Sequence, residues 1–486
     1  MEQIIHLVTS IPTWVFITFI AHLVVLGSVA YMILLERKVA SWAQDRIGPN
    51  RVGFDFGLPF LPRFHFWGLG QPLADGLKFL VKEDYKPAGV DKKLFTIAPL
   101  IMIIVIIPSI ATIPWGGWHQ KTTTVEVSAT VAAADPAAVE RAVADALPHS
   151  AIIVGSPRPV IERAVVGSDI RRFEVEYRYP FQIANLNIGV LFILATLSLA
   201  VYGVVVGGWA SNNKYSFLGG LRATANMISY EIPLALSVLT IIIMFGSLNL
   251  DEIVQKQTHL WFGVIPAWNV FTQPLAFVLF LICIHAEANR APFDLAEAEQ
   301  ELVGGYHTEY SAMRFAMFFL AEYAGMITTS LVLVALFFGG WHLPYLTDGR
   351  VDGAPATVTD SLILCVIRAV ILYTKALLVM FVFMWVRWSL PRFRFDQLMN
   401  IAWKGLIPIS LALVIGTIVV VALTGGRTFN VVTPAHAGLF LLMNAVVLVL
   451  MFVVYGLWPK GRDLNRPVDV IGSRFRSTPL PGTPVR

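Results

Sequence analysis

Charge and cysteine are both scarce in this chain of 486 residues. Only 14% of its residues are charged and 56% are hydrophobic, which leaves too few polar groups to cover a soluble globule of this size. The two cysteines, Cys283 and Cys365, fall within apolar stretches, so no disulfide framework is expected. The sequence has no glycine-rich phosphate loop, no cysteine cluster and no His/Cys metal spacing, and His285 and His307 are isolated. We therefore expect no metal and no redox cofactor on this chain.

Long apolar windows are what the sequence has instead. A helix of about 20 residues crosses roughly 30 Å of hydrocarbon. Such windows predict an all-α integral membrane helix bundle with about nine transmembrane helices. The first window is not a cleavable signal, because it lacks a basic n-region and is too long. The windows are residues 11–35, 94–114, 186–207, 227–247, 270–288, 311–338, 360–386, 400–424 and 434–457.

The distribution of Lys and Arg predicts the orientation. Basic residues gather in the loops on one side, with Arg37, Lys38, Arg392 and Arg394 as examples, and are nearly absent from the short loops on the other side. Since cytoplasmic loops carry this excess, the N-terminus is predicted outside and the C-terminus in the cytoplasm of a bacterial inner membrane. The net charge of +4 is what this bias alone would give, so nucleic acid is not indicated as a partner.

Four regions are predicted along the chain. Their limits follow the apolar windows and two polar stretches. The regions are residues 1–120, the first two transmembrane helices with a cytoplasmic amphipathic helix; 121–179, a small α+β extracytoplasmic insert; 180–458, a seven-helix core with the acidic loop 287–310; and 459–486, a cytoplasmic tail. Within the first region, residues 67–86 are too polar to span, and Leu73, Leu77 and Leu80 line one helical face, which is typical of a helix in the interface plane.

The insert shows the patterns of a compact module. Val125, Val127, Ala129 and Val131 alternate with polar residues, as in a half-buried strand. Asp135 and Pro136 then begin a short helix, with Val139, Val143 and Leu147 on one face. Residues 151–155 and 160–166 are candidate strands, and a last strand is expected over 173–179. No catalytic spacing appears, so the insert is interpreted as contacting a partner or decorating the loop.

The acidic loop reverses the usual sign of a cytoplasmic loop. From Glu287 to Arg314 there are six carboxylates but only two basic side chains, Arg290 and Arg314. A helix beginning at Pro292 would place Asp294, Glu297 and Glu301 on one face and Glu299 on the other. Crowded carboxylates repel and respond to nearby charge, although a solvated acidic face explains the same residues equally well.

Ionisable residues inside the apolar windows weaken that second explanation. Glu231 follows Tyr230 at the start of the fourth window, and Glu322 lies before Tyr323 in the sixth. A charge within a membrane span is costly and by default indicates function. Arg368 and Lys375 are seven residues apart in the seventh window, and Arg368 is expected to extend to the outer surface.

The first cytoplasmic loop combines Arg37 and Trp42 with turn residues at the membrane surface. It is either a positively charged anchor or the mouth of a tunnel for an amphiphilic ligand, with arginine orienting a polar head between apolar walls. Composition does not decide between the two. The loop also holds Glu36, Lys38 and the run 45–53.

Together these strings resemble the H subunits of the proton-translocating NADH–quinone oxidoreductases, which are the quinone-site membrane subunits of respiratory complex I. The resemblance covers essentially all the cytoplasmic loops and several spans. The insert 121–179 and extra residues around 54–67 depart from the family pattern. The matching strings are residues 36–38, 46–53, 71–76, 208–213, 228–231, 286–310 and 391–399.

The resemblance implies a role in a larger enzyme. The chain would house part of a quinone tunnel and couple quinone reduction to proton translocation, as a membrane subunit without its own redox cofactor. NADH, FMN and Fe–S clusters would sit on partners, which include hydrophilic quinone-site subunits and antiporter-like membrane subunits. Arg37, Trp42, Asp75 and Arg290 would belong to the tunnel. The proton-coupling path would comprise Glu231, Glu287, Asp294, Glu297, Glu301 and Glu322, with Tyr230, Tyr323, Lys375 and Arg392 as neighbours.

Two alternatives stay open at this point. A membrane subunit of an energy-converting hydrogenase-type complex shares this ancestry, and genomic neighbours encoding an NADH module would separate the two. A stand-alone ion or proton transporter using Glu231, Glu322 and Lys375 is disfavoured, because no inverted repeat is visible. Such a transporter would be active alone, whereas a member of a complex would be inert without its partners.

Overall fold

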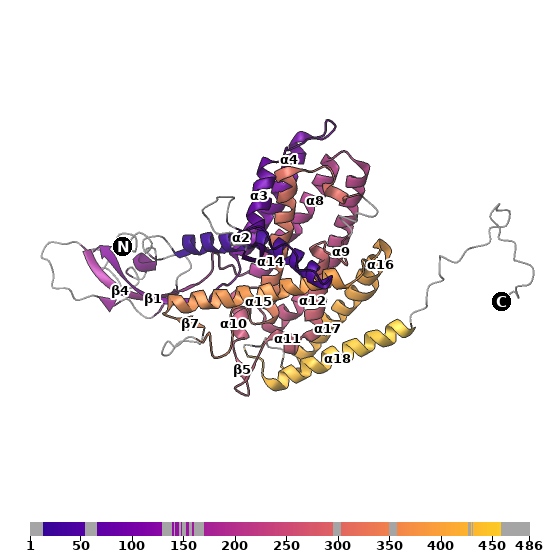
Figure 1. The fold of residues 1–486 in the computed structure, drawn as a ribbon. Coiled ribbons are helices and arrows are strands. Elements are labelled where there is room, and N and C mark those ends of the chain that lie inside the picture. Colours follow the sequence, from indigo (N-terminus) through magenta and orange to yellow (C-terminus); the bar gives the residue numbers. More distant parts are fainter. Residues whose placement is uncertain are drawn as a thin grey trace, which may run out of the picture.

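The computed structural model describes residues 13–53, 66–128, 139, 141–144, 147, 152–154, 158–159, 170–294, 303–348, 357–425, 429 and 431–457. Helices dominate this part of the chain (Figure 1). Two of the short elements, η1 and η2, are 3₁₀ turns, and η3 is a π-helical turn within the segment from α16 to α17. The helices are α2 (Thr13–Ala43), η1 (Phe66–Gly68), α3 (Gln71–Val81), α4 (Lys92–Ala111), α7 (Gly189–Ser198), α8 (Ala200–Ala210), α9 (Lys214–Phe245), α10 (Leu250–Lys256), α11 (Asn269–Thr272), α12 (Pro274–Glu287), η2 (Gly305–His307), α14 (Ala312–Phe337), α15 (Leu362–Ser389), α16 (Phe395–Asn400), η3 (Ile401–Leu406), α17 (Ile407–Leu423) and α18 (Pro434–Leu457).

Seven helical segments of the described chain are long and apolar enough to cross a membrane. They coincide with seven of the nine predicted windows. Of the other two windows, 270–288 contains α12, an apolar helix of 14 residues, and 11–35 lies in α2, a helix of 31 residues whose first side chains are outside the described set. The seven segments are α4, α7 with α8, α9, α14, α15, α16 with α17, and α18.

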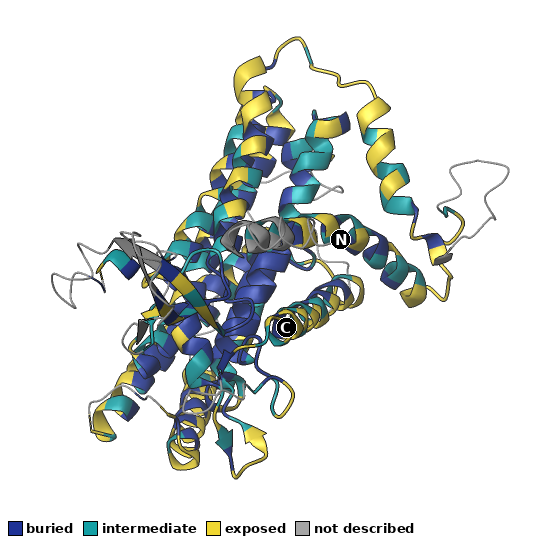
Figure 2. Ribbon diagram, turned by 90° about the vertical axis from the view of Figure 1, so that its left-hand side faces the viewer, coloured by how far each residue is buried: buried dark blue, intermediate teal, exposed yellow. Residues whose placement is uncertain are grey.

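Helix α14 lies at the centre of the bundle. Residues 326–337 are all buried, so this half of the helix is surrounded by neighbours on every side (Figure 2). α4, α15, α2 and α12 pack against it. A helix covered on all sides has little freedom to shift, which makes α14 a fixed support for the ionisable side chains near its start.

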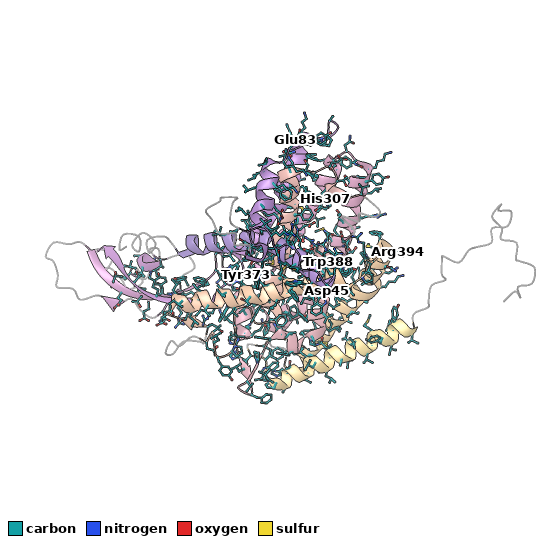
Figure 3. All side chains as sticks on the ribbon, in the orientation of Figure 1. Asp45, Glu83, His307, Tyr373, Trp388 and Arg394 are labelled. Carbon is teal, nitrogen blue, oxygen red and sulfur yellow. The ribbon has the colours of Figure 1, made fainter. Side chains whose placement is uncertain are left out.

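Helices α2 and α15 run side by side across α14 (Figure 1). The Tyr373 hydroxyl of α15 bonds to Ser28 of α2, and Figure 3 marks the position of Tyr373 along its helix. Helix α3 also packs against α2 and α14, which confirms a helix in the polar segment 67–86, although it is only 11 residues long. Leu73, Leu77 and Leu80 remain partly exposed on it, as expected for a helix whose apolar face is not covered by its own chain.

A small sheet lies beyond the N-terminal end of α15. Strands β1 (Trp118–Ser128) and β4 (Ile170–Pro180) pair antiparallel along their full length. The strand order is β2-β4-β1-β7, and β3 also pairs with β4. The remaining strands are β2 (Ile152–Ile153), β3 (Arg158–Pro159) and β7 (Val358–Thr359), and a separate hairpin joins β5 (Leu260–Trp261) to β6 (Ile265–Pro266).

The insert's predicted core is confirmed. Val139, Val143 and Leu147 are buried against Phe173 and Val175 of β4, so the short helix covers one face of the hairpin. The candidate strand 151–155 is reduced to β2, and the candidate strand 160–166 lies outside the described residues. The predicted tail, 459–486, lies outside them as well.

One contact fastens the sheet to the helical part of the chain. The Trp118 indole donates a 2.7 Å hydrogen bond to the Asp251 carboxylate of α10, and the Gln255 amide donates to the same oxygen. Burial raises the pKa of Asp251 to about 6, with Glu252 adding to the rise and the two hydrogen bonds opposing it.

Two cations of α15 bind backbone carbonyls, and Lys375 does so just past the C-terminal end of α14. Lys375 donates to the carbonyls of Phe338, Gly340 and His342, at 2.7 to 3.0 Å. Arg368 donates to the carbonyls of Gly116, Thr347 and Thr357 and stacks over Trp341 at 4.4 Å. The expectation that Arg368 extends to the surface is wrong, because these carbonyls draw it inward and it is 0% exposed.

Candidate functional site: a cavity joined to buried carboxylates

A cavity of about 900 Å³ opens between α2, α3 and the start of α14. Its walls are mainly apolar, because the inner faces of all three helices contribute aliphatic or aromatic side chains. A space of this size and lining suits a long apolar ligand with a polar end. The apolar lining includes Leu26, Val29, Ile33, Leu73, Leu77, Leu80, Phe315 and Phe319.

Charged residues of the first loop stand on the wall of this cavity. Arg37 forms a 2.8 Å ion pair with Asp75 of α3, and Gln71 donates to the other Asp75 oxygen at 3.0 Å. The pair is partly exposed to solvent and ties α3 to the end of α2. Trp42 is 58% exposed and does not line the cavity, whereas Trp388 of α15 does.

A cluster of buried charge forms the other side of the cavity. Glu36 accepts from the Tyr323 hydroxyl and from Arg387, and it lies 3.6 Å from the Arg290 guanidinium. Arg290 also stacks over the Tyr323 ring at 4.3 Å. These four residues come from α2, α14, α15 and the loop after α12, so the crossing of three helices brings them together. Glu36 and Arg290 are each less than one-tenth exposed.

Arg290 connects this cluster to a second carboxylate. Its guanidinium lies 3.6 Å from Glu322 of α14, whose other oxygen accepts a 3.0 Å hydrogen bond from Tyr306. At 3.6 Å the Arg290 contacts to Glu36 and Glu322 are ion pairs rather than short hydrogen bonds. One cation is therefore shared between two acids that face opposite ways, Glu36 toward the large cavity and Glu322 away from it.

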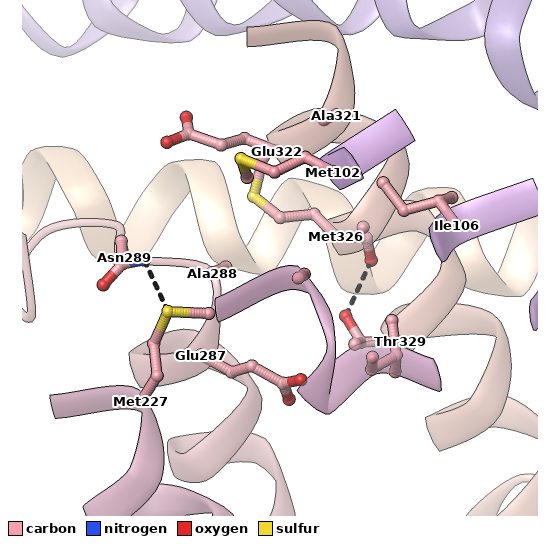
Figure 4. Close-up of a pocket in the computed structure, with 13 residues that line it drawn as sticks. Met102, Ile106, Met227, Glu287, Ala288, Asn289, Ala321, Glu322, Met326 and Thr329 are labelled. Carbon is pink, nitrogen blue, oxygen red and sulfur yellow. Dashed lines mark hydrogen bonds between the residues drawn. The ribbon is translucent and has the colours of Figure 1, made fainter. Parts of the chain in front are cut away.

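A second cavity, of about 50 Å³, lies beyond Glu322 (Figure 4). Both Glu322 and Glu287 line it, together with methionines from α4, α9 and α14. One water needs about 10–15 Å³ of such volume, so the space is large enough for a few waters. Asn289 also lines this cavity and donates to the Met227 sulfur at 3.4 Å, as the dashed line in Figure 4 shows.

The next carboxylate after Glu287 is Glu231 on α9. The two are close enough for like-charge repulsion to act between them. Glu231 is half-buried and bonded to the Ser198 hydroxyl, where α7 ends. Its neighbour Tyr230 is fully buried and donates to the Leu398 carbonyl of α16 at 3.1 Å. The residues Glu36, Arg290, Glu322, Glu287 and Glu231 thus form a series from the large cavity to α9.

The acidic loop departs from its predicted structure. Residues 291–294 form a turn and a bend, so no helix begins at Pro292. The reason is a tie to the segment before α16, in which Arg392 pairs with Asp294 at 2.9 Å and the Phe393 amide donates to the Pro292 carbonyl. Glu297 and Glu301 lie outside the described residues, as does Glu299.

Lys375 lies away from this series. It binds carbonyls that follow the C-terminal end of α14, whereas Glu322 is in the first half of that helix. Sixteen positions separate Glu322 from Phe338, or roughly 24 Å along a helix axis. The structure therefore does not bring Lys375 together with the carboxylates.

Sequence reasoning missed Glu36, Arg387 and Tyr306. Glu36 is followed directly by two basic residues, which drew attention away from it. Arg387, in the last turn of α15, has the position of the basic residues that commonly follow a membrane span on the cytoplasmic side. One signal could have identified Glu36. It is an acid directly after the apolar window 11–35, at the start of a loop that otherwise begins with the basic residues Arg37 and Lys38. Within the described ranges, no three His, Cys, Asp or Glu side chains gather where they could hold a metal ion.

Fold and site together define a multi-helix membrane protein with an apolar cavity and a series of buried acids. The family model described as NADH dehydrogenase matches residues 16–140 and 170–418. The chain belongs to this family, the H subunits of NADH–quinone oxidoreductases, which confirms the resemblance seen in the sequence.

Several curated relatives are similar over most of their length. H subunit 1 of the NADH-quinone oxidoreductase of Cytophaga hutchinsonii is 40% identical over 387 residues, which cover 80% of this chain and 90% of the relative. The corresponding H subunit of Leptospira biflexa is 41% identical over 80% of this chain and 90% of its own. H subunit 1 of Geobacter metallireducens is 40% identical over 81% and 92%. The family match itself omits residues 141–169, which lie within the insert.

Proposed function

We propose that the large cavity is the access tunnel for a quinone and that the series of buried carboxylates couples quinone reduction to proton translocation. The observation that carries this proposal is the position of Arg290. Its guanidinium touches Glu36 on the cavity wall and Glu322 at the start of the inner series. A change of charge in the cavity therefore acts directly on the first member of that series.

The proposed coupling depends on the negative charge that develops on the quinone as it is reduced. Reduction of a quinone to a quinol takes up two electrons and two protons, and electrons reach the ring before its charge is neutralised. In this proposal the electrons come from partner subunits, and the negative charge that develops attracts Arg290 and Arg387. Glu322 then loses part of its cation partner, which favours its neutral, protonated form.

The inner series passes that change onward. When Glu322 takes up a proton, the change of charge occurs beside the small cavity that Glu287 also lines. Glu287 is in turn coupled to Glu231 by like-charge repulsion. In this proposal the neighbouring carboxylates gain and lose protons as a coupled set. The antiporter-like subunits would be the destination, and Tyr230, with its bond to α16, would hold the end of the series in place. Asp294 and Arg392 belong to the cytoplasmic side of the same path, with Glu297 and Glu301 beside them in sequence.

The topology is part of the proposal. α2 is long enough to span, and α11 with α12 together cover residues 269–287, so nine crossings are proposed for the whole chain. The Lys and Arg distribution supports a topology with the acidic loop in the cytoplasm of a bacterial cell and the insert outside. The other subunits of the complex would then meet this chain at the cytoplasmic loops and along the lipid-facing helices.

Replacing Arg290 by methionine tests the proposal, because methionine fills similar space without charge. We expect NADH–quinone activity and proton pumping to fall together by at least tenfold, since hydrogen bonds and ion pairs of buried charge contribute about 1.5–3 kcal/mol. Electron transfer from NADH to a hydrophilic artificial acceptor should persist in the same membranes.

The matched control is Arg314→Met. Arg314, at the start of α14, pairs with Asp84, which is 42% exposed, so its loss should cost less than the loss of Arg290 between two buried acids. Equal activities for the Arg290 and Arg314 variants, in complexes assembled to the same level, would overturn the proposal.

A further inference from the structure

Ser198 lies where the helix pair α7 and α8 is interrupted, directly against Glu231. Its hydroxyl oxygen is in hydrogen-bonding range of two acceptors. One is the Leu194 carbonyl, four residues earlier, at 2.8 Å, and the other is a carboxylate oxygen of Glu231. A serine hydroxyl has one proton, so it donates to only one of these acceptors at a time.

We infer that Ser198 is a positioning residue that satisfies Glu231 in both of its charge states. When Glu231 is charged, the hydroxyl turns toward the carboxylate and donates to it. When Glu231 is protonated, the acid donates to the serine oxygen, and the serine proton turns to the Leu194 carbonyl. Each state leaves Glu231 hydrogen-bonded, and rotation about one bond converts one arrangement into the other. This inference rests on the proposed role of Glu231 in proton coupling.

The surroundings of Ser198 favour a change of charge at this point. Its neighbours Leu197 and Ala200 line the small cavity that Glu287 and Glu322 share, so the interruption between α7 and α8 borders that space. A serine hydroxyl in a helix can bond to the carbonyl four residues earlier, so Leu194 offers a second acceptor within reach of Ser198. Of the groups packed against α9, Glu287 acts on Glu231 by repulsion. The other titratable or charged side chains on elements packed against α9 are Tyr202 on α8, Cys283 and His285 on α12, Tyr306 and His307 on η2, Asp396 on α16 and Lys404 on η3.

The two hydrogen bonds differ in strength. A bond to a charged carboxylate is roughly twice as strong as one between neutral groups. Loss of the hydroxyl therefore weakens the charged state of Glu231 more than the neutral state. For Ser198→Ala we expect the pH profile of quinone reduction and of pumping to move to higher pH by about 0.5–1 unit.

The experiment compares five variants as assembled complexes in membrane vesicles, with both activities measured across pH. They are Ser198→Ala, Ser198→Thr, Ser237→Ala, Glu231→Gln and the double variant Ser198→Ala with Glu231→Gln. Thr keeps a hydroxyl and should restore the original profile. Ser237 lies on α9, is buried and donates only to the Leu234 carbonyl, so its loss should leave the profile unchanged. In the Glu231→Gln background, loss of Ser198 should shift the pH profile of the residual activity no further.

Three outcomes would overturn the inference. They are an unchanged profile for Ser198→Ala, a shift of the same size for Ser198→Thr, and a shift that persists when Glu231 is already glutamine. Failure of the proposed function looks different, because Glu231→Gln would then retain the activity and pumping of the unmodified complex.

Discussion

Arg290 and Arg368 are both nearly completely buried, 4% and 0% exposed, but different kinds of oxygen hold them. Arg290 lies between the carboxylates of Glu36 and Glu322, at 3.6 Å from each. Arg368 donates to backbone carbonyls at 2.7 to 3.2 Å. A carboxylate can gain a proton and lose its charge, whereas a carbonyl dipole cannot. The first arrangement can therefore change its balance of charge during a reaction, and the second cannot.

The same contrast separates the two ends of α14. Near its start, Glu322 and Tyr323 take part in the shared cluster around Arg290. At its C-terminal end, Lys375 binds three carbonyls and so caps the helix with positive charge. A helix held at one end by hydrogen bonds to backbone carbonyls provides a steady support for the carboxylate at the other.

The largest effect is expected at the carbonyl-held arginine. Arg368→Met would leave several buried carbonyls without a donor, at a cost of about 3–5 kcal/mol. We expect the chain to fail to accumulate in assembled complexes, as measured by native gels of solubilised membranes. Lys93→Met, an exposed change at the start of α4, is the control. Normal assembly with lost activity would place Arg368 in the same class as Arg290 and remove the distinction.

Substitution of Glu36 should have the opposite result to substitution of Arg368. The complex should assemble, but its activity should be lost. Glu36→Gln retains shape and hydrogen bonding but removes the charge that Arg290 and Arg387 share. Quinone reduction should fall about 10–100-fold, while electron transfer to a hydrophilic acceptor continues. Glu83→Gln is the control, since Glu83 is exposed and lies two residues beyond the last residue of α3 (Figure 3). If the complex disappears from the membrane instead, Glu36 is structural.

A smaller effect should follow from narrowing the large cavity. Ala40 lines it, so Ala40→Trp should raise the apparent KM for quinone roughly fivefold or more, through overpacking of about 1 kcal/mol or more. Arg37→Ala should act in the same direction by releasing Asp75. Ala43→Trp, three residues on at an exposed position, should leave the KM unchanged. A fall in kcat without a rise in KM for Ala40→Trp and Arg37→Ala would argue against a tunnel here.

The smallest effect is expected from the insert. Replacing residues 121–179 by a short Gly/Ser linker removes a hairpin with its own core, distant in sequence from the cavity residues. NADH–quinone activity per assembled complex should stay within about twofold, because ΔΔG contributions of distant sites are largely independent. A fully assembled complex without activity would contradict this expectation, whereas loss of assembly would assign the insert a docking role.

Local pattern was enough to predict much of the fold. The apolar windows located the seven long helices, and alternation along β4 located the insert's core, because length and periodicity respond directly to burial. The carboxylates within spans were likewise visible, since their cost in a membrane marks them.

Long-range geometry was not predictable in the same way. Glu36 and Arg387 are 351 residues apart, and their contact depends on how α2 and α15 cross α14. The fully buried position of Arg368 depends on carbonyls from three separate segments. The turn at Pro292 depends on residues 392 and 393, so helical periodicity within the acidic loop could not reveal it.

The register between β1 and β4 brings the two ends of the insert close together. Trp118 is paired directly with Pro180, so the chain leaves the helical part and returns to it at points one strand spacing apart, about 5 Å. A unit attached through neighbouring ends can be gained, lost or exchanged without moving the helices on either side. The same site would accept a foreign domain with adjacent termini, such as a fluorescent reporter or an affinity handle. This position is therefore a suitable insertion site for a label on the side of the complex that carries the sheet.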